Sequence, residues 1–338
     1  MTKNSMKVLV TGGAGFIGSH TIVELLSAGM SPVIVDDFRN SKPFILDRLR
    51  EITNKDTICY NVDCTDEKAL RPVFEKEQPD AVIHFAAYKA VGESVEKPIM
   101  YYDNNIGSLV TVLKLMQEFD CKKIIFSSSC TVYGNPDNAE VSESTPMGLA
   151  TSPYGYTKQA GEALLQDLGR TETGVKSILL RYFNPIGAHT SALIGELPIG
   201  VPNNLVPFIT QTAAGQRPHL SIFGNDYATN DGTCIRDYIH VSDLADAHVK
   251  ALLKIDQVKK PCTAYNVGTG KGSSVQEVVD AFIKVTGQNI NYKFAPRRSG
   301  DVVEIYANGS KCRDELGWHP KYSLEDALLH AWKWQESL

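Results

Sequence analysis

Two side chains four residues apart, Tyr154 and Lys158, could together carry out proton transfer. Ser152 suits a helix N-cap and Pro153 the first helical position, so a helix that begins there places the pair on one face. A nearby ammonium favours phenolate, and lowering a tyrosine pKa from about 10 to about 7 requires roughly 4 kcal/mol of differential stabilisation. Ser129, which follows a predicted strand, is the natural hydroxyl donor. The spacing alone also fits a packed tyrosine beside an exposed lysine.

Three glycines, Gly12, Gly15 and Gly18, lie where a strand predicted over residues 7–10 turns into a helix predicted over residues 16–26. Small residues at such a turn allow a tight reversal, close approach of the backbone to a phosphate, and close packing of helix on strand. The free N–H groups and the positive end of the helix dipole then face the bound anion. A purely structural glycine-rich turn is the alternative.

A carboxylate follows these glycines at the distance typical of dinucleotide-binding folds. The second predicted strand, residues 32–35, ends in Asp36 and Asp37, about twenty positions past the glycines. A carboxylate there accepts hydrogen bonds from a ribose and repels a 2′-phosphate, which favours NAD over NADP. Arg39 is the one nearby feature that favours NADP, and we interpret it as a solvated side chain.

Strands and helices alternate through the first half of the chain, which predicts an α/β fold with a Rossmann-type doubly wound parallel sheet. From about residue 185 the pattern loosens, which predicts a smaller C-terminal α/β lobe that binds the substrate. We therefore assign residues 1–184 to an NAD-binding domain with the catalytic residues, and residues 185–338 mainly to the substrate lobe, with some segments returning to the first domain. The remaining predicted elements are strands over residues 57–63, 80–85, 123–127, 176–181 and 220–223, helices over residues 66–76, 99–119, 205–214, 242–254 and 274–286, and an ordered loop over residues 185–203.

Composition argues against several function classes. The 338 residues carry a formal net charge of −5 and no basic cluster suited to nucleic acid or a membrane surface. No apolar run approaches the roughly 18 residues of a membrane span, and residues 1–5 lead into a strand without the features of a signal peptide. Seven cysteines without a CxxC pair predict reduced thiols and a cytoplasmic location. Eight histidines without metal-ligand spacing predict that no metal is bound.

Three motifs in this order resemble those of the extended short-chain dehydrogenase/reductases: Thr-Gly-Gly-x-Gly-x-x-Gly at residues 11–18, Ser-Ser-Ser-x-x-Val-Tyr-Gly at 127–134 and Ser-Pro-Tyr-x-x-x-Lys at 152–158. Within this family the chain is similar to the UDP-glucose 4-epimerases along nearly its whole length. The supporting stretches are residues 85–94, 101–105, 180–185, 222–227, 236–241 and 295–301. Sugar-nucleotide 4,6-dehydratases of the same superfamily carry an Asp-Glu pair where Cys130 and Thr131 stand here, and neither of these can act as the acid or base for water elimination.

The resemblance implies interconversion of UDP-glucose and UDP-galactose through a 4-keto sugar, with NAD+ held through turnover. It makes Tyr154 the base at the sugar 4-hydroxyl, and it implies that Lys158 bonds the nicotinamide ribose and lowers the tyrosine pKa. The positions expected at the cofactor are Gly12, Gly15, Phe16, Ile17, Gly18, Asp36, Asp37, Asn40, Ser41, Asp63, Cys64, Phe85, Ala86, Ala87, Lys89, Asn104, Ser129, Tyr154, Lys158 and Phe183. Those expected at the UDP-sugar are Lys89, Ser129, Tyr154, Asn184, Asn204, Leu205, Ser221, Phe223, Arg236, Tyr238, Arg298, Asp301 and Ile305.

Other functions remain compatible with these residues. A net oxidoreductase of the same fold would use exchangeable NAD(P), and a UDP-N-acetylglucosamine 4-epimerase would use the same chemistry. A catalytically silent sugar-nucleotide-binding protein is disfavoured by the intact set of Ser129, Tyr154 and Lys158. In similar epimerases a tyrosine at the position of Ile305 accompanies plain hexoses and a small residue accompanies N-acetyl sugars, so we expect weak activity on the latter.

The resemblance also predicts a homodimer. The helix predicted over residues 99–119 has an apolar stripe that includes Ile106 and Val110, and the helix of Tyr154 continues with Ala163 and Leu164. In the family, these two helices meet their copies across a two-fold axis in a four-helix interface. Burial of the stripe within one subunit is the alternative.

Overall fold

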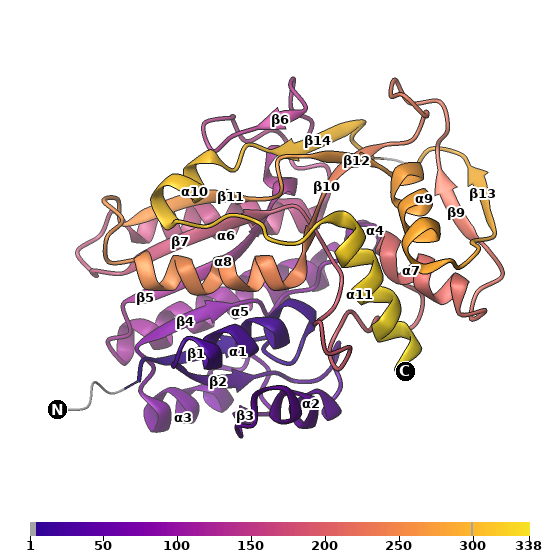
Figure 1. Ribbon diagram of the computed structural model, residues 1–338. Helices are drawn as coiled ribbons and strands as arrows, with labels where there is room; N and C mark the ends of the chain where they lie inside the picture. Colours follow the sequence, from indigo (N-terminus) through magenta and orange to yellow (C-terminus); the bar gives the residue numbers. More distant parts are fainter. Residues whose placement is uncertain (1–4, 299) are drawn as a thin grey trace.

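The computed structural model describes residues 5–298 and 300–338; residues 1–4, on which part of the signal-peptide expectation rests, and residue 299 lie outside it. Its centre is a seven-stranded parallel sheet in the order β11-β7-β5-β4-β1-β2-β3 (Figure 1). The strands are β1 (Lys7–Thr11), β2 (Ser31–Val35), β3 (Ile58–Tyr60), β4 (Ala81–His84), β5 (Lys123–Ser129), β7 (Lys176–Tyr182) and β11 (Cys262–Val267). The strand order reverses between β1 and β4, and the ligand crevice of such sheets lies at this switch point. The predicted Rossmann-type fold is confirmed.

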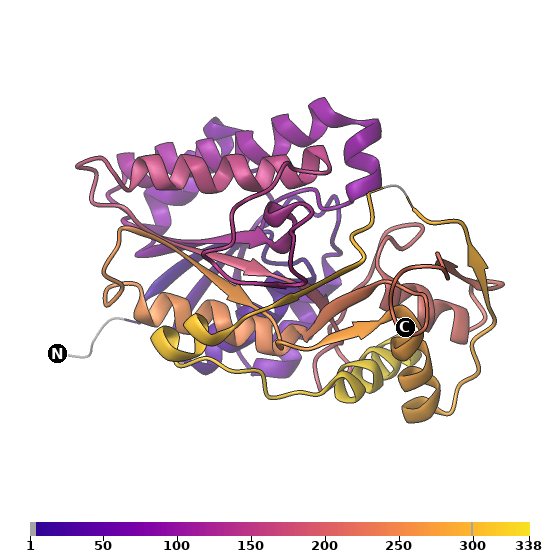
Figure 2. The ribbon, with the colours of Figure 1, turned by 90° about the horizontal axis from the view of Figure 1, so that it is seen from above.

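Helices cover both faces of this sheet, as Figure 2 shows for α5 and α6 on one side and α8 on the other. One face carries α1 (Phe16–Ser27), α2 (Phe44–Thr53) and α8 (Val241–Lys254), and the other carries α3 (Glu67–Glu77), α5 (Pro98–Glu118) and α6 (Pro153–Leu168). Successive side chains of β1 point to opposite faces of the sheet. Val8 and Val10 pack with α1 and α8, whereas Leu9 packs with α3 and α5. A strand buried on both faces reads as a continuous apolar run, which is the pattern seen in the sequence.

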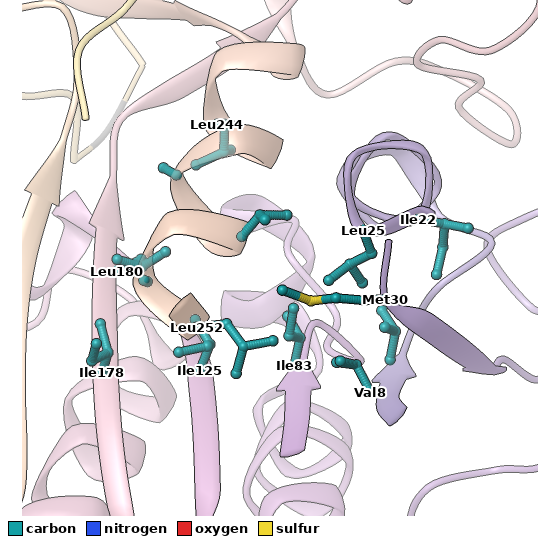
Figure 3. Packing of buried hydrophobic residues seen from close by; sticks show 14 of the residues in the cluster. Val8, Ile22, Leu25, Met30, Ile83, Ile125, Ile178, Leu180, Leu244 and Leu252 are labelled. Atoms are coloured by element: carbon teal, nitrogen blue, oxygen red, sulfur yellow. The ribbon is translucent and has the colours of Figure 1, made fainter. Parts of the chain in front are cut away.

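The apolar cluster between α1, α8 and the sheet is shown in Figure 3. Val8, Ile83 and Ile125 from neighbouring strands are fully buried there, together with Leu25 of α1 and Leu252 of α8. Apolar burial of this kind is the main stabilising contribution to a fold. Because this packing secures α1 against β1, the glycine turn between them has a defined position at the carboxyl end of the sheet.

Several elements differ from the sequence-based expectations. The helix α2 was not predicted, nor was the short helix α4 (Val91–Glu96). The third strand is shorter than expected, at three residues, while β5 runs on to Ser129. The largest difference is β11, which was not predicted as a strand and returns from the second half of the chain to pair with β7 at the sheet edge.

The second half of the chain builds most of a smaller lobe. A mixed sheet has the order β12-β10-β14-β6, with β8 also paired to β10, and β9 pairs with β13. The elements are β6 (Glu140–Val141), β8 (Asn184–Ile186), β9 (Leu220–Phe223), β10 (Ile235–His240), β12 (Gly272–Ser274), β13 (Tyr292–Ala295), β14 (Glu304–Ala307), α7 (Leu205–Ala213), α9 (Val275–Thr286), α10 (Ser310–Leu316) and α11 (Leu324–Glu336). The loop predicted over residues 185–203 begins only at residue 187, because residues 185 and 186 belong to β8. Within the described ranges, no helix has both the length and the apolarity to cross a membrane.

Candidate active site

The two candidate proton-transfer residues lie on α6 as predicted. The Ser152 hydroxyl accepts a hydrogen bond from the Gly155 backbone N–H at 3.1 Å, and Pro153 is the first helical residue. Tyr154 and Lys158 are 9% and 4% exposed, and the lysine Nζ lies 5.8 Å from the centroid of the tyrosine ring. The Nζ donates to the backbone oxygen of Ser127 at 2.7 Å, which ties α6 to β5 two residues before Ser129. The structure therefore places Ser129, Tyr154 and Lys158 together.

Burial controls the protonation of this group. It raises the pKa of Tyr154 above its ordinary value, Tyr182 adds to the rise, and a hydrogen bond with Ser129 opposes it. Burial also lowers the pKa of Lys158 to about 8. The protein's own side chains thus keep Tyr154 as a neutral phenol at pH 7. The low tyrosine pKa expected from the Tyr–Lys spacing requires a further positive charge beside the ring.

The glycine turn fits a dinucleotide. Gly12 adopts φ of +67°, and a Cβ on it would lie 3.0 Å from the Ala86 backbone nitrogen. A Cβ on Gly18 would lie 2.2 Å from the Gly12 oxygen, so any larger residue would force β1 and α1 apart. Because the N-cap of α1 is Gly15, its first backbone N–H groups meet no capping side chain. A phosphate can therefore approach the helix N-terminus closely.

Asp36 directly follows β2 and lies beside the glycine turn. Its carboxylate accepts from the backbone N–H groups of Ala14 and Phe38, both at 3.0 Å, and from the Ser41 hydroxyl at 2.8 Å. Burial raises the pKa of Asp36, and these hydrogen bonds oppose the rise. A carboxylate has about four acceptor positions, so capacity remains for a ribose hydroxyl. Asp36 also links the glycine turn to the loop after β2.

The other residues expected at the cofactor also follow the strands. Asp63 and Cys64 follow β3, residues 85–89 follow β4, Phe183 follows β7, and Asn104 projects from α5. The side chains of Cys64 and Phe183 are packed into buried apolar clusters, so only their backbones are available to a ligand. Asn40 and Ser41 lie in the loop between β2 and α2.

Arg39 in the same loop is 39% exposed, as expected for a solvated side chain, but it is also engaged in a network of ion pairs and hydrogen bonds. Its guanidinium forms ion pairs with Asp37, at 2.6 Å, and with Asp63. It also donates to the hydroxyl of Tyr88 at 2.8 Å and lies 3.4 Å from the side-chain oxygen of Asn104. The sequence could not reveal this because the loop brings Arg39 to partners that are 49 and 65 residues away in the chain.

The substrate lobe brings the two expected arginines together. Asp301 accepts a hydrogen bond from Arg298 at 2.8 Å and lies 3.7 Å from a guanidinium nitrogen of Arg236. The Arg298 guanidinium also lies over the ring of Phe223, 5.8 Å from its centroid. Two forked guanidinium groups that share one carboxylate are suited to a diphosphate.

The remaining expected substrate residues belong to neighbouring strands of the lobe. Pairing of β10 with β8 sets Tyr238 opposite Asn184, and pairing with β14 sets Arg236 opposite Ile305. Ile305 is 4% exposed and belongs to a buried cluster with Val132 and Phe183, next to the turn that follows Ser129. Positions elsewhere in the lobe are Ser221 on β9, and Asn204 and Leu205 at the start of α7.

Glu196 is a residue of this region that the sequence analysis missed. One of its carboxylate oxygens accepts from Lys89 Nζ at 2.8 Å and from the Asn204 side chain at 2.6 Å. Its backbone oxygen accepts from the indole of Trp334 on α11 at 3.0 Å. Glu196 therefore joins an expected cofactor residue to an expected substrate residue. The only sequence signal was an acidic residue in a loop rich in glycine and proline.

Comparisons with known proteins show the family to which the chain belongs. The family model described as GDP-mannose 4,6 dehydratase matches residues 9–330. The chain is 50% identical to UDP-glucose 4-epimerase 2 of Arabidopsis thaliana, over 97% of this chain and 94% of that protein. It is also 50% identical to the UDP-glucose 4-epimerase of Bacillus subtilis, over 98% and 97% of the two chains. The crystal structure of the Bifidobacterium longum UDP-glucose 4-epimerase in complex with NAD+ and UDP matches with a TM-score of 0.95, 47% identity and 98% coverage of both chains.

The turn after β5 distinguishes this site from that of a dehydratase. Burial raises the pKa of the Cys130 thiol to about 11, so the group stays protonated at neutral pH. Thr131 contributes only a hydroxyl. Among the described residues, no group of three or more histidine, cysteine or acidic side chains is placed to hold a metal ion. The chemistry available here is proton transfer by a buried tyrosine at the end of β5, on the same edge of the parallel sheet as the turn that fits a dinucleotide.

Proposed function

The chain belongs to the UDP-glucose 4-epimerases, isomerases of the extended short-chain dehydrogenase/reductase family that depend on NAD, and from this we propose that Tyr154 transfers the proton when UDP-glucose and UDP-galactose are interconverted. The proposal rests on how the structure arranges the residues of the site. Tyr154, Lys158 and Ser129 lie together at the carboxyl end of β5, on the same edge of the parallel sheet as the turn that fits the dinucleotide, while Arg236 and Arg298 meet at Asp301 in the other lobe.

We propose the following roles for the residues of this chain. Bound NAD+ would supply a positive ring charge, the acceptor of the C4 hydride and, in its reduced form, the donor that returns this hydride to the other face of the sugar. Tyr154, as phenolate, takes the proton of the sugar 4-hydroxyl and returns it to the O4 oxygen of the 4-keto sugar after the sugar has turned. Ser129 orients the phenolic oxygen by its hydrogen bond, and Lys158 adds a nearby positive charge. Arg236 and Arg298 hold the diphosphate while the 4-keto sugar turns.

The test uses purified protein with no added cofactor. Denaturation should release about one NAD per chain, and incubation with UDP-galactose should give a mixture with UDP-glucose, measured by NMR of the anomeric protons. The reaction is an isomerisation, so absorbance at 340 nm should show no net accumulation of NADH. Activity that appears only with added NAD(P)H and consumes it in proportion to product would instead support the net oxidoreductase.

We also propose which ligand each half of the chain binds, and in which cellular compartment the protein works. Residues 1–184 supply most of the NAD site, and residues 185–338 mainly supply the UDP-sugar site, with β11 and α8 returning to the first sheet. All seven cysteines are free thiols, which supports a reducing compartment such as the cytoplasm.

A homodimer through α5 and α6 is the proposed assembly. These helices pack side by side on one face of the sheet (Figure 2). They leave Ile106 and Val110 partly exposed on α5, and on α6 they leave Ala163 exposed and Leu164 partly exposed. Unpartnered apolar side chains on two adjacent helices suit a four-helix interface. Light scattering at micromolar concentration should give twice the chain mass of 37.1 kDa, and a purely monomeric mass would exclude the dimer.

Substrate breadth should depend on Ile305. Its β-branched side chain is stiff and buried beside the turn after Ser129, so an N-acetyl arm on a turning sugar should meet it. Wild type should prefer UDP-glucose and UDP-galactose. Ile305→Ser should raise kcat/KM for UDP-N-acetylglucosamine by about tenfold, the scale of one or two methylenes in a pocket. Unfolding curves of both proteins serve as the control for cavity formation. If the ratio of kcat/KM for the N-acetylated and plain UDP-hexoses is the same in both proteins, or if wild type uses both sugar classes equally, then Ile305 does not exclude N-acetylated sugars.

A further inference from the structure

Arg39 connects three loops that follow strands of the parallel sheet. Its Nε pairs with Asp37 after β2, at 2.6 Å, and one terminal nitrogen pairs with Asp63 after β3. The other terminal nitrogen donates to Tyr88 after β4 at 2.8 Å and lies 3.4 Å from the Asn104 oxygen on α5. The planar guanidinium also lies 5.8 Å from the centroid of the Tyr88 ring. All three guanidinium nitrogens are therefore engaged.

Three of these partners, Asp37, Asp63 and Asn104, are residues expected at the cofactor, and Asp37 belongs to the acidic pair expected to face a ribose. Their loops are separate segments of chain, and Arg39 is the group that touches all of them. The carboxylates of Asp37 and Asp63 repel each other, and the positive guanidinium between them offsets this electrostatic repulsion. A lysine could not replace it, because its ammonium is a point charge without the fork that reaches several partners at once.

The charges around Arg39 also exclude one role for it. Asp36, Asp37 and Asp63 contribute three carboxylates to this end of the site, against one guanidinium. The guanidinium already pairs with two of these carboxylates, so it is not free to bind the 2′-phosphate of NADP. The excess negative charge would also repel that phosphate.

We infer that Arg39 is a positioning residue for the adenosine end of the dinucleotide, which holds the loops after β2, β3 and β4 in the arrangement that binds NAD and so slows its release. The inference rests on the proposed function, in which NAD stays bound through turnover. Loops ordered before binding lose less conformational entropy when the ligand arrives, and the complex gains affinity accordingly. Loss of a charge-assisted hydrogen-bond network of this size should raise the rate of NAD dissociation by about tenfold or more.

The experiment measures NAD release from the purified holoenzyme. Protein loaded with radiolabelled NAD is mixed with a large excess of unlabelled NAD, and the label retained on the protein is followed over time. Arg39→Ala should release NAD at least about tenfold faster than wild type, and Arg39→Lys should fall between the two. Added NAD should restore the turnover of Arg39→Ala in a concentration-dependent manner, which a general folding defect would not show.

Arg71→Ala is the matched control. Arg71 is also 39% exposed and also joins two carboxylates, Glu67 and Glu118, but these lie on α3 and α5 and on none of the three loops that Arg39 connects. Its removal should leave NAD release unchanged, so an equal acceleration in both variants would overturn the inference. Equal retention by wild type and Arg39→Ala would also overturn it, as would NADP binding by wild type that disappears in Arg39→Ala. Wild type that neither carries nor takes up NAD would instead overturn the proposed function, and the inference with it.

Discussion

Replacing Tyr154 with phenylalanine is expected to lower turnover by at least about a hundredfold, the usual scale for a lost acid–base group. The change removes one oxygen and keeps the ring that packs beneath Lys158, so the fold and both binding sites should persist. Turnover of UDP-galactose is the measurement, with NAD content and UDP binding by calorimetry as controls.

The pH profile gives a second readout of the same variant. The protein's own groups raise the pKa of Tyr154, so the bound-state phenol must be acidified by the positive charge of the cofactor. Wild-type kcat should therefore rise with pH as the phenol ionises, and the residual activity of Tyr154→Phe should lack this limb. Near-normal turnover in the variant would remove Tyr154 from the mechanism.

Lys158→Met is expected to lose activity on a similar scale and yet to stabilise the NAD-free protein at neutral pH. Burial lowers the pKa of Lys158 to about 8, whereas an unfolded lysine titrates near 10.4. Holding the ammonium in this buried position therefore costs up to about 3 kcal/mol below pH 8, less what the hydrogen bond to Ser127 returns. Methionine has a similar length and no charge to desolvate.

The sign of the pH dependence follows from the direction of this shift. Between about pH 8 and pH 10.4 the unfolded chain binds more protons at this lysine than the folded chain, so its contribution to stability rises with pH. Urea unfolding of both NAD-free proteins at pH 7 and pH 10 is the measurement. The advantage of Lys158→Met should be largest at pH 7 and shrink at pH 10. A variant less stable than wild type at pH 7, or a difference independent of pH, would contradict this account.

Short-range rules were enough to predict much of this protein from its sequence. The start of α6 follows from an N-cap serine and a first-turn proline, and both act within three residues. The glycine turn follows from backbone sterics over eight residues, and the parallel sheet follows from repeated strand–helix units. Because these effects are local, the order of residue types along the chain contains them, and the set Ser129, Tyr154 and Lys158 could be named before any coordinates.

Contacts between distant segments were decided only by the tertiary structure. Arg39 meets Asn104 across 65 residues, and Lys89 meets Glu196 across 107, so no window of sequence contains either pair. The return of β11 to the edge of the first sheet is a choice of strand partner, which an apolar run does not specify. The protonation of Tyr154 and Lys158 likewise depends on how completely the fold removes them from water, because the cost of charging a side chain is set by its surroundings and not by its neighbours in the chain.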